Sequence, residues 1–107
     1  QTAGMVNARR LSAMKPTALL VNTARGGLIV ETDLAQALRD GVIAGAALDV
    51  LTEEPVGDTP LADLENCTLT PHVAWTPLET RQRLLEQAVE NVRCWLDGKP
   101  QNVITAP

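Results

Sequence analysis

The segment that most constrains the fold is a mostly apolar run at residues 17–21, TALLV, which leads directly into the turn NTARGG at residues 22–27. A short apolar run of this kind is typical of a strand that is buried on both faces of a parallel sheet. Gly26 and Gly27 lack a Cβ atom, so we expect a left-handed or strained turn that aims the guanidinium of Arg25 outward. Open α/β sheets bind ligands where strands end in such turns, which makes Arg25 a candidate binding residue.

Helical and extended patterns alternate along the rest of the chain. A short helix is predicted at residues 7–15, an extended piece at 28–30, and strands at 42–50 and 68–70 with a short helix between them. A helix that Thr32 or Asp33 caps should end at Gly41, and a long helix should cover residues 78–97. Strands that alternate with helices in this way predict an α/β fold, half of a doubly wound parallel sheet with flanking helices.

Composition narrows the class of protein. The 107 residues are 45% hydrophobic and 21% charged, with a formal net charge of −4, which indicates one ordinary globular domain. The acidity and the lack of a Lys/Arg cluster argue against nucleic-acid binding. The sequence has no apolar run near eighteen residues and no signal-peptide pattern, so we expect a soluble, cytoplasmic protein.

Two cysteines, Cys67 and Cys94, lie in unlike contexts, one in a strand pattern and one in a helix pattern. We interpret both as buried free thiols in a reducing compartment. A disulfide between them remains an alternative.

Each of the three predicted strands is followed by charged or titratable side chains. Arg25 follows the first strand, a carboxylate cluster including Asp49 and Glu54 follows the second, and His72, the single histidine, follows the third. The carboxyl ends of parallel strands meet at one edge of a sheet, so these groups should open onto the same site. One histidine after a strand is more often a surface residue, but three such strand ends together favour a function.

These residue types suit acid/base chemistry on a small anionic oxo- or hydroxy-acid. A guanidinium holds a substrate carboxylate with two parallel hydrogen bonds and polarises an adjacent carbonyl. Histidine exchanges a proton near neutral pH, and a carboxylate on its far nitrogen fixes the tautomer and favours the imidazolium.

Other chemistries fit the sequence poorly. One histidine and two distant cysteines do not make a zinc set. The only serine, Ser12, lies in the first helix without a nucleophile elbow, and neither a Walker loop nor a Gly-x-Gly-x-x-Gly motif occurs.

Three motifs resemble those of the D-isomer-specific 2-hydroxyacid dehydrogenases over essentially the whole chain. MKP at residues 14–16 with VNTARGG at 21–27 resembles the arginine motif of the family. AALDV at 46–50, running to Glu54 and Pro55, resembles the aspartate and glutamate motif, and LTPH at 69–72 resembles the histidine motif. Trp75 and GKPQNV at 98–103 are most similar to the glycerate dehydrogenase (hydroxypyruvate reductase) branch.

The resemblance implies a Rossmann-like fold and specific roles. Arg25 would bind the substrate carboxylate, His72 would donate the proton, and Glu54 would orient His72. The nicotinamide end of NAD or NADP would be lined by Thr23, Ala24, Arg25, Asp49, His72, Val73, Ala74 and Trp75. The family passes a hydride between this cofactor and a 2-keto or 2-hydroxy acid, here best matched to hydroxypyruvate/D-glycerate or glyoxylate, and a homodimer is expected.

Family members are longer and carry a glycine-rich phosphate loop, a ribose-selecting residue and a substrate domain, which would precede Gln1. Residues 1–107 would therefore be the C-terminal portion of the dinucleotide-binding domain, without the loop and the substrate domain. Glu31 stands where the family often has aspartate. Two alternatives remain open: a catalytically silent, self-associating α/β module, and an α/β domain in which Arg25, Glu54 and His72 are merely solvated.

Overall fold

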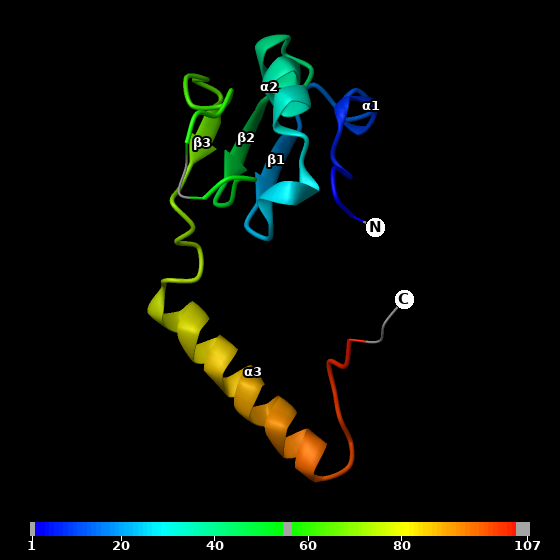
Figure 1. The fold of residues 1–107 in the computed structure, drawn as a ribbon, viewed down its shortest axis with the longest axis vertical. Helices are drawn as coiled ribbons and strands as arrows, with labels where there is room; N and C mark the ends of the chain where they lie inside the picture. Colours follow the sequence, from blue (N-terminus) through cyan, green and yellow to red (C-terminus); the bar gives the residue numbers. More distant parts are fainter. Residues whose placement is uncertain (1, 55–56, 105–107) are drawn as a thin grey trace. The chain divides into compact units, whose positions relative to one another are not determined.

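The computed structural model describes residues 2–54 and 57–104, and the chain divides into two compact units, residues 1–74 and 75–107 (Figure 1). The first unit carries a parallel sheet and its helices, and the second carries one long helix with the segment that follows it. Pro55, which closes the predicted glutamate motif, lies outside the described residues.

Within the described residues, three parallel strands form one sheet in the order β1-β2-β3. They are β1 (Leu19–Asn22), β2 (Gly45–Leu48) and β3 (Cys67–Leu69). Leu19 pairs with Gly45, and Ala46 pairs with Cys67, so the carboxyl ends of the strands lie close to level. The strands predicted at 17–21, 42–50 and 68–70 are confirmed, with shifted or shorter bounds.

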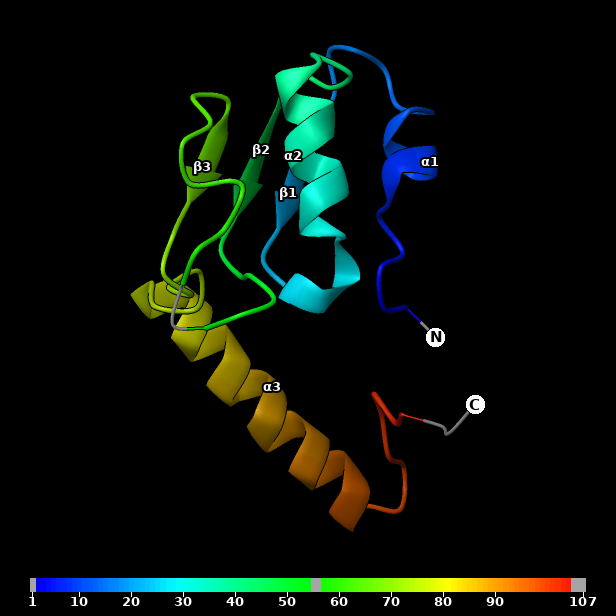
Figure 2. The same ribbon diagram turned by 45° about the horizontal axis from the view of Figure 1, so that its top comes forward.

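One face of this sheet is covered by α2 (Glu31–Arg39), which lies along β1 and β2 (Figure 2). Leu34, Ala35 and Leu38 of α2 are buried, because the apolar positions of the helix recur on one side of it. They share a core with other buried residues, among them Leu11, Ile43, Leu48 and Leu61.

The expectation that the first strand is buried on both faces is wrong. Leu20 and Asn22 are partly or fully buried, whereas Leu19 and Val21 are 74% and 66% exposed. Side chains alternate between the two faces of a strand, so a continuous apolar run also arises when only one face is covered.

The first helix, α1 (Ala8–Leu11), is shorter than the predicted 7–15. Asn7 caps it by accepting from the backbone N–H of Arg10. Beyond Leu11 the backbone N–H of Met14 donates to the carbonyl of Leu11, three residues back, so the chain tightens into turns ahead of Pro16.

The predicted cap of the second helix is also wrong. The N-cap of α2 is Val30, with no side-chain cap bond, and the helix ends at Arg39, ahead of Gly41 at φ +66°. The carboxylate of Asp33 instead accepts from the backbone N–H of Ala8 at 2.8 Å and so ties α1 to α2.

The connections differ from the expectation in two further places. The extended piece predicted at 28–30 is replaced in part by a 3-10 helix, η1 (Gly26–Leu28), and Ile29 then forms a bridge with Val6. The short helix expected between the second and third strands is not present in the described part of residues 51–66.

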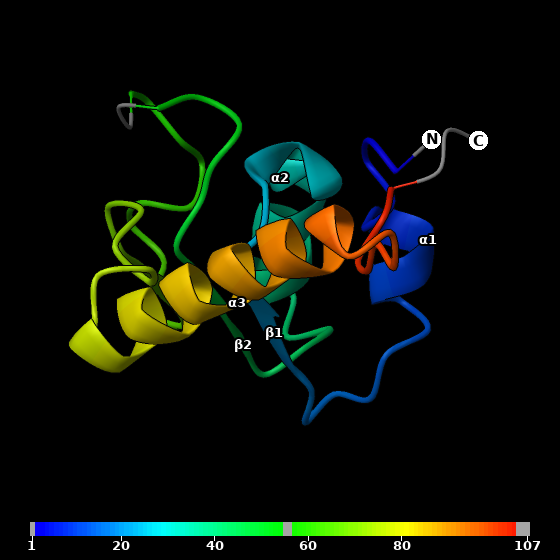
Figure 3. The same ribbon diagram turned by 90° about the horizontal axis from the view of Figure 1, so that it is seen from below.

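The second unit consists mainly of α3 (Leu78–Leu96), a single uninterrupted helix (Figure 3). The prediction of a helix at 78–97 is confirmed, and Gly98 at φ +71° follows its end. Its apolar residues, including Leu85, Val89, Val92 and Trp95, are exposed. In the described part of the chain, no helix is both long and apolar enough to cross a membrane.

Cys67 and Cys94 are free thiols, as the sequence indicated, but both are half-buried rather than buried. Desolvation raises the pKa of both thiols, so they are protonated and poorly nucleophilic near neutral pH.

Candidate active site

The carboxyl ends of the strands border a cavity of about 510 Å³ in the first unit. Its lining comprises Arg25, Gly26, Gly27, Val50, Leu51, Thr52, Glu54 and His72. The structure therefore brings together Arg25, Glu54 and His72, the three residues that the sequence singled out for chemistry.

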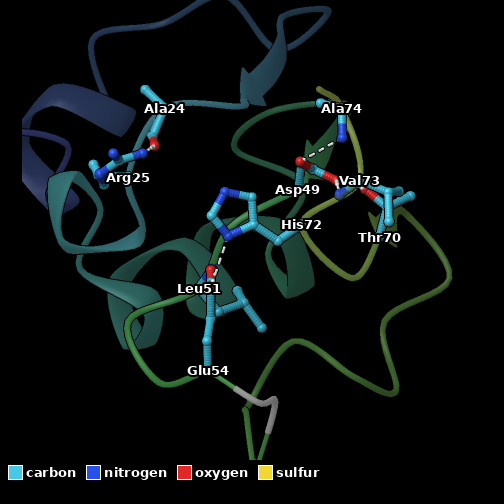
Figure 4. Close-up of polar contacts among 9 residues, drawn as sticks. All are labelled: Ala24, Arg25, Asp49, Leu51, Glu54, Thr70, His72, Val73 and Ala74. Carbon is cyan, nitrogen blue, oxygen red and sulfur yellow. Dashed lines mark hydrogen bonds and ion pairs between the residues drawn. The ribbon is translucent and has the colours of Figure 1, made fainter. Parts of the chain in front are cut away.

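The imidazole of His72 is paired with the carboxylate of Glu54. Nδ1 of His72 lies 2.8 Å from Oε2 of Glu54, and both side chains are partly exposed (Figure 4). The backbone N–H of Leu51 donates to Oε1 of Glu54 at 3.2 Å, so both carboxylate oxygens are engaged. The hydrogen bond to His72 lowers the pKa of the Glu54 carboxyl, which is therefore ionised near neutral pH. An ionised carboxylate only accepts, so Nδ1 carries a proton and donates it.

His72 has an unusual backbone conformation. Its φ of 55° lies in the left-handed region, which few residues other than glycine adopt. The backbone N–H of His72 donates to the carbonyl oxygens of Asp49, at 2.9 Å, and Thr70, at 3.0 Å. Strained backbone of this kind concentrates at functional sites, where the surroundings hold it in place.

Asp49, at the end of β2, supplies most of that support. Its side chain is 5% exposed and accepts from the hydroxyl of Thr70 at 2.5 Å and from the backbone N–H groups of Val73 and Ala74 at 2.9 Å each (Figure 4). These bonds, the one from Thr70 foremost, lower the pKa of the Asp49 carboxyl. The carboxylate thus fixes the turn on which His72 sits.

A second cavity, of about 230 Å³, lies beside Asp49. It is lined by Val21, Thr23, Ala47, Leu48, Asp49, Thr68, Thr70, Val73 and Ala74. Four residues that the sequence assigned to the nicotinamide end, Thr23, Asp49, Val73 and Ala74, therefore share one cavity. Trp75 begins the second unit, and its cofactor contact stays a prediction.

Arg25 is exposed and lies in extended backbone just before η1. Its Nη1 donates to the carbonyl of Ala24 at 2.6 Å. A guanidinium carries five N–H donors, so this bond leaves it able to bind a carboxylate as well.

Gly26 serves a different purpose from the one the sequence suggested. Neither Gly26 nor Gly27 has a positive φ, so the expected left-handed turn is wrong. A Cβ on Gly26 would lie 2.0 Å from the carbonyl carbon of Leu51, whereas one on Gly27 would meet nothing within 4 Å. Gly26 is therefore required for the close approach of the Arg25 turn to the segment that carries Glu54.

Three supporting residues were missed at the level of sequence. Asn22 bonds the Arg25 turn, Thr70 bonds Asp49, and Glu31 accepts from the backbone N–H of Thr52 at 2.7 Å and from the hydroxyl of Thr59 at 3.1 Å. The available signal was local and covers Asn22 alone, because an asparagine that ends a strand often bonds the backbone of the turn that follows.

No group of three or more metal-ligating side chains occurs within residues 2–54 and 57–104.

Comparison with known proteins places the chain in a family. The profile described as "D-isomer specific 2-hydroxyacid dehydrogenase, NAD binding domain" matches residues 1–74. The chain is 50% identical over 108 residues to a glycerate dehydrogenase of Methylorubrum extorquens, covering 98% of this chain and 34% of that protein. It is 46% identical to a hydroxypyruvate reductase of Blautia hydrogenotrophica, covering 97% of this chain and 33% of that protein.

Solved structures agree with the fold. An acyclic imino acid reductase in complex with NADPH and D-Arg superimposes with a TM-score of 0.77 at 41% identity, covering 97% of this chain and 33% of that one. This confirms the expected α/β fold, the second half of a Rossmann-like doubly wound sheet. The chain spans about a third of the length of these relatives. By its motifs, its fold and its matches, the chain belongs to the D-isomer-specific 2-hydroxyacid dehydrogenase family.

Proposed function

We propose that residues 1–107 are the C-terminal portion of the dinucleotide-binding domain of an NAD- or NADP-dependent D-2-hydroxyacid dehydrogenase. The whole enzyme would pass a hydride between the nicotinamide and a small 2-keto or 2-hydroxy acid. One observation carries the proposal: Arg25, Glu54 and His72 line a single cavity at the carboxyl edge of the sheet.

The substrate is proposed to be hydroxypyruvate/D-glycerate or glyoxylate. Similar proteins are named glycerate dehydrogenase, hydroxypyruvate reductase and glyoxylate reductase, which supports a small acid. The guanidinium of Arg25 would bind the substrate carboxylate with two parallel hydrogen bonds and polarise the adjacent carbonyl.

His72, oriented by Glu54, would transfer the proton. When the substrate carbonyl carbon accepts a hydride, its oxygen must gain a proton, and the imidazolium of His72 supplies it. Glu54, bonded to Nδ1 at 2.8 Å, would hold the ring so that Nε2 is the atom that exchanges the proton. In the direction of oxidation, the neutral imidazole would accept the hydroxyl proton.

The residues present fit the nicotinamide end of the cofactor, which supplies or accepts the hydride when bound. The second cavity has apolar strand residues, Val21 and Ala47, beside polar groups of Thr23 and Asp49. An apolar surface with a few polar groups is what a flat heteroaromatic carboxamide requires. The glycine-rich phosphate motif is not in these 107 residues, so we assign pyrophosphate binding to other parts of the whole enzyme.

We further propose that the enzyme is a cytoplasmic homodimer. The exposed apolar residues of β1 and α3 support the dimer, because apolar surface of this kind is commonly buried against another protein surface.

Replacement of Arg25 tests the proposal in the intact protein. Arg25→Lys keeps the charge but loses the paired hydrogen bonds, so kcat/KM for hydroxypyruvate should fall by about 10²-fold or more. Arg39→Lys is the matched control, because the Arg39 guanidinium is bonded to the carbonyl of Pro60 and does not line the cavity. Unchanged kinetics of Arg25→Lys with hydroxypyruvate and glyoxylate would remove Arg25 from the site.

A further inference from the structure

The side chain of Asn22 is buried directly beneath the turn that carries Arg25. It is the last residue of β1 and is 6% exposed; it and Asp49 are the buried polar side chains among the described residues. A buried amide is costly unless its donor and acceptor both form hydrogen bonds, so the partners of the amide indicate its role.

Both polar atoms of that amide bond the turn itself. Nδ2 of Asn22 donates to the carbonyl oxygen of Arg25 at 2.9 Å, and Oδ1 accepts from the backbone N–H of Ala24 at 3.0 Å. The backbone of Asn22 is fixed in turn, because its carbonyl accepts from the N–H of Asp49 at 2.9 Å. Asn22 therefore links the sheet to both residues that precede Gly26.

The position of the guanidinium depends on these same backbone groups. The side chain of Arg25 is exposed, and its Nη1 is bonded to the carbonyl of Ala24. A shift of the Ala24–Arg25 backbone would therefore move both the Cα atom of Arg25 and the carbonyl oxygen to which its Nη1 donates.

We propose that Asn22 is a positioning residue for Arg25: it fixes the turn so that the guanidinium meets the substrate carboxylate. The proposal rests on the proposed function. It explains why the strand ends in asparagine, since the turn requires one donor and one acceptor on a short planar group. Aspartate at this position would supply only the acceptor, and its negative charge would repel the carbonyl oxygen of Arg25.

A double-mutant cycle in the intact protein separates this role from a general structural one. Asn22→Ala alone should lower kcat/KM for hydroxypyruvate by about tenfold, chiefly through KM, while the Kd for NADH changes by less than about twofold. In the Arg25→Lys background, where the paired hydrogen bonds are already lost, Asn22→Ala should lower kcat/KM by less than about twofold.

Asn66→Ala is the matched control. Its Nδ2 donates to the carbonyl of Leu38 at 3.0 Å, so the variant deletes a comparable side-chain-to-backbone bond away from the cavity. It should lower the melting temperature and leave kcat/KM unchanged in both backgrounds. Where Asn22→Ala fails to fold, Asn22→Ser takes its place, because serine is small and uncharged and so buries no unpaired charge beneath the turn.

The outcomes are distinct. The positioning role is overturned if the effects of Asn22→Ala and Arg25→Lys on kcat/KM multiply. It is also overturned if a folded Asn22 variant keeps the kcat/KM of the parent. Either result leaves the proposed function standing. Normal kinetics of Arg25→Lys alone remove Arg25 from the site and so overturn the part of the proposed function on which the positioning role rests. A large effect of Asn22→Ala in the parent that nearly vanishes in the Arg25→Lys background supports the positioning role.

Discussion

The pair of His72 and Glu54 is where the proton chemistry is proposed to reside. The two side chains meet at 2.8 Å, and Glu54 is also held by the backbone N–H of Leu51. The pKa of the Glu54 carboxyl is lowered by this pairing, so a negative charge sits against the imidazole at neutral pH. The carboxylate accepts from Nδ1, which fixes the orientation of the ring.

Glu54→Gln removes that charge and keeps the shape of the side chain. In the parent, kcat/KM should fall at acid pH as the Glu54 carboxylate gains a proton and its bond to Nδ1 of His72 weakens. Glu54→Gln has no carboxylate to titrate, so this acidic limb of the profile should be lost. The measurement is the pH profile of kcat/KM in the intact enzyme, with Glu53→Gln as the control that removes a charge one residue away. A Glu54→Gln profile identical to the parent's refutes the pairing.

Individual residues were predictable from the sequence to different degrees. Arg25 and His72 were found because each follows a strand, and parallel strands bring their ends to one edge. Glu54 was singled out from the carboxylate cluster after the second strand only by its resemblance to the family motif. The bonds of Asn22 and Thr70 were not, because a side chain reaches a backbone group only in a particular turn geometry, which the sequence pattern does not specify.

At the scale of elements, the Arg25 turn and the Leu51–Glu54 segment approach each other through Gly26. The contact leaves no room for a Cβ, which would lie 2.0 Å from the carbonyl carbon of Leu51. Gly26 thus allows the turn after β1 and the segment after β2 to pack directly against each other.

Gly26→Ala and Gly27→Ala form a matched pair. Gly26→Ala must displace backbone, so its free energy of unfolding should fall by about 1–3 kcal/mol or more, as in overpacked cores. Gly27→Ala meets nothing within 4 Å, so its free energy of unfolding should stay within about 0.5 kcal/mol of the parent's. Chemical denaturation measures both, and equal stabilities of the two variants would contradict the close approach.

Element types were largely predictable, and their details were not. Apolar runs and helical spacing located the three strands, α2 and α3. The capping of α2 was misassigned because Asp33 bonds Ala8, twenty-five residues away, and such a tertiary bond leaves no local signal. The exposed face of β1 was missed because Leu19 and Val21 are as apolar as their buried neighbours.

At the scale of the whole molecule, much apolar surface is exposed. Leu19 and Val21 of β1 and several residues of α3 are exposed, and β1 pairs on one side only within the described residues. Burial of such surface contributes about 25 cal/mol per Å², and an unpaired strand edge is a template for association.

The 107-residue chain alone should therefore self-associate at micromolar concentration and should not reduce hydroxypyruvate. Sedimentation velocity measures the first property, and loss of NADH absorbance measures the second. Leu19→Lys should weaken association, because a charge on an edge strand opposes pairing. A monomer that reduces hydroxypyruvate with NADH would contradict both expectations.

The most direct test of the proposed chemistry is the rate of the chemical step in the His72→Asn variant of the intact enzyme. Asparagine tolerates the left-handed conformation that His72 adopts at φ 55°, so the turn should be retained while the proton donor is lost. Single-turnover oxidation of NADH by hydroxypyruvate should slow by about 10²- to 10⁴-fold, with a much smaller change in NADH affinity. A chemical step as fast as the parent's would show that His72 does not supply the proton.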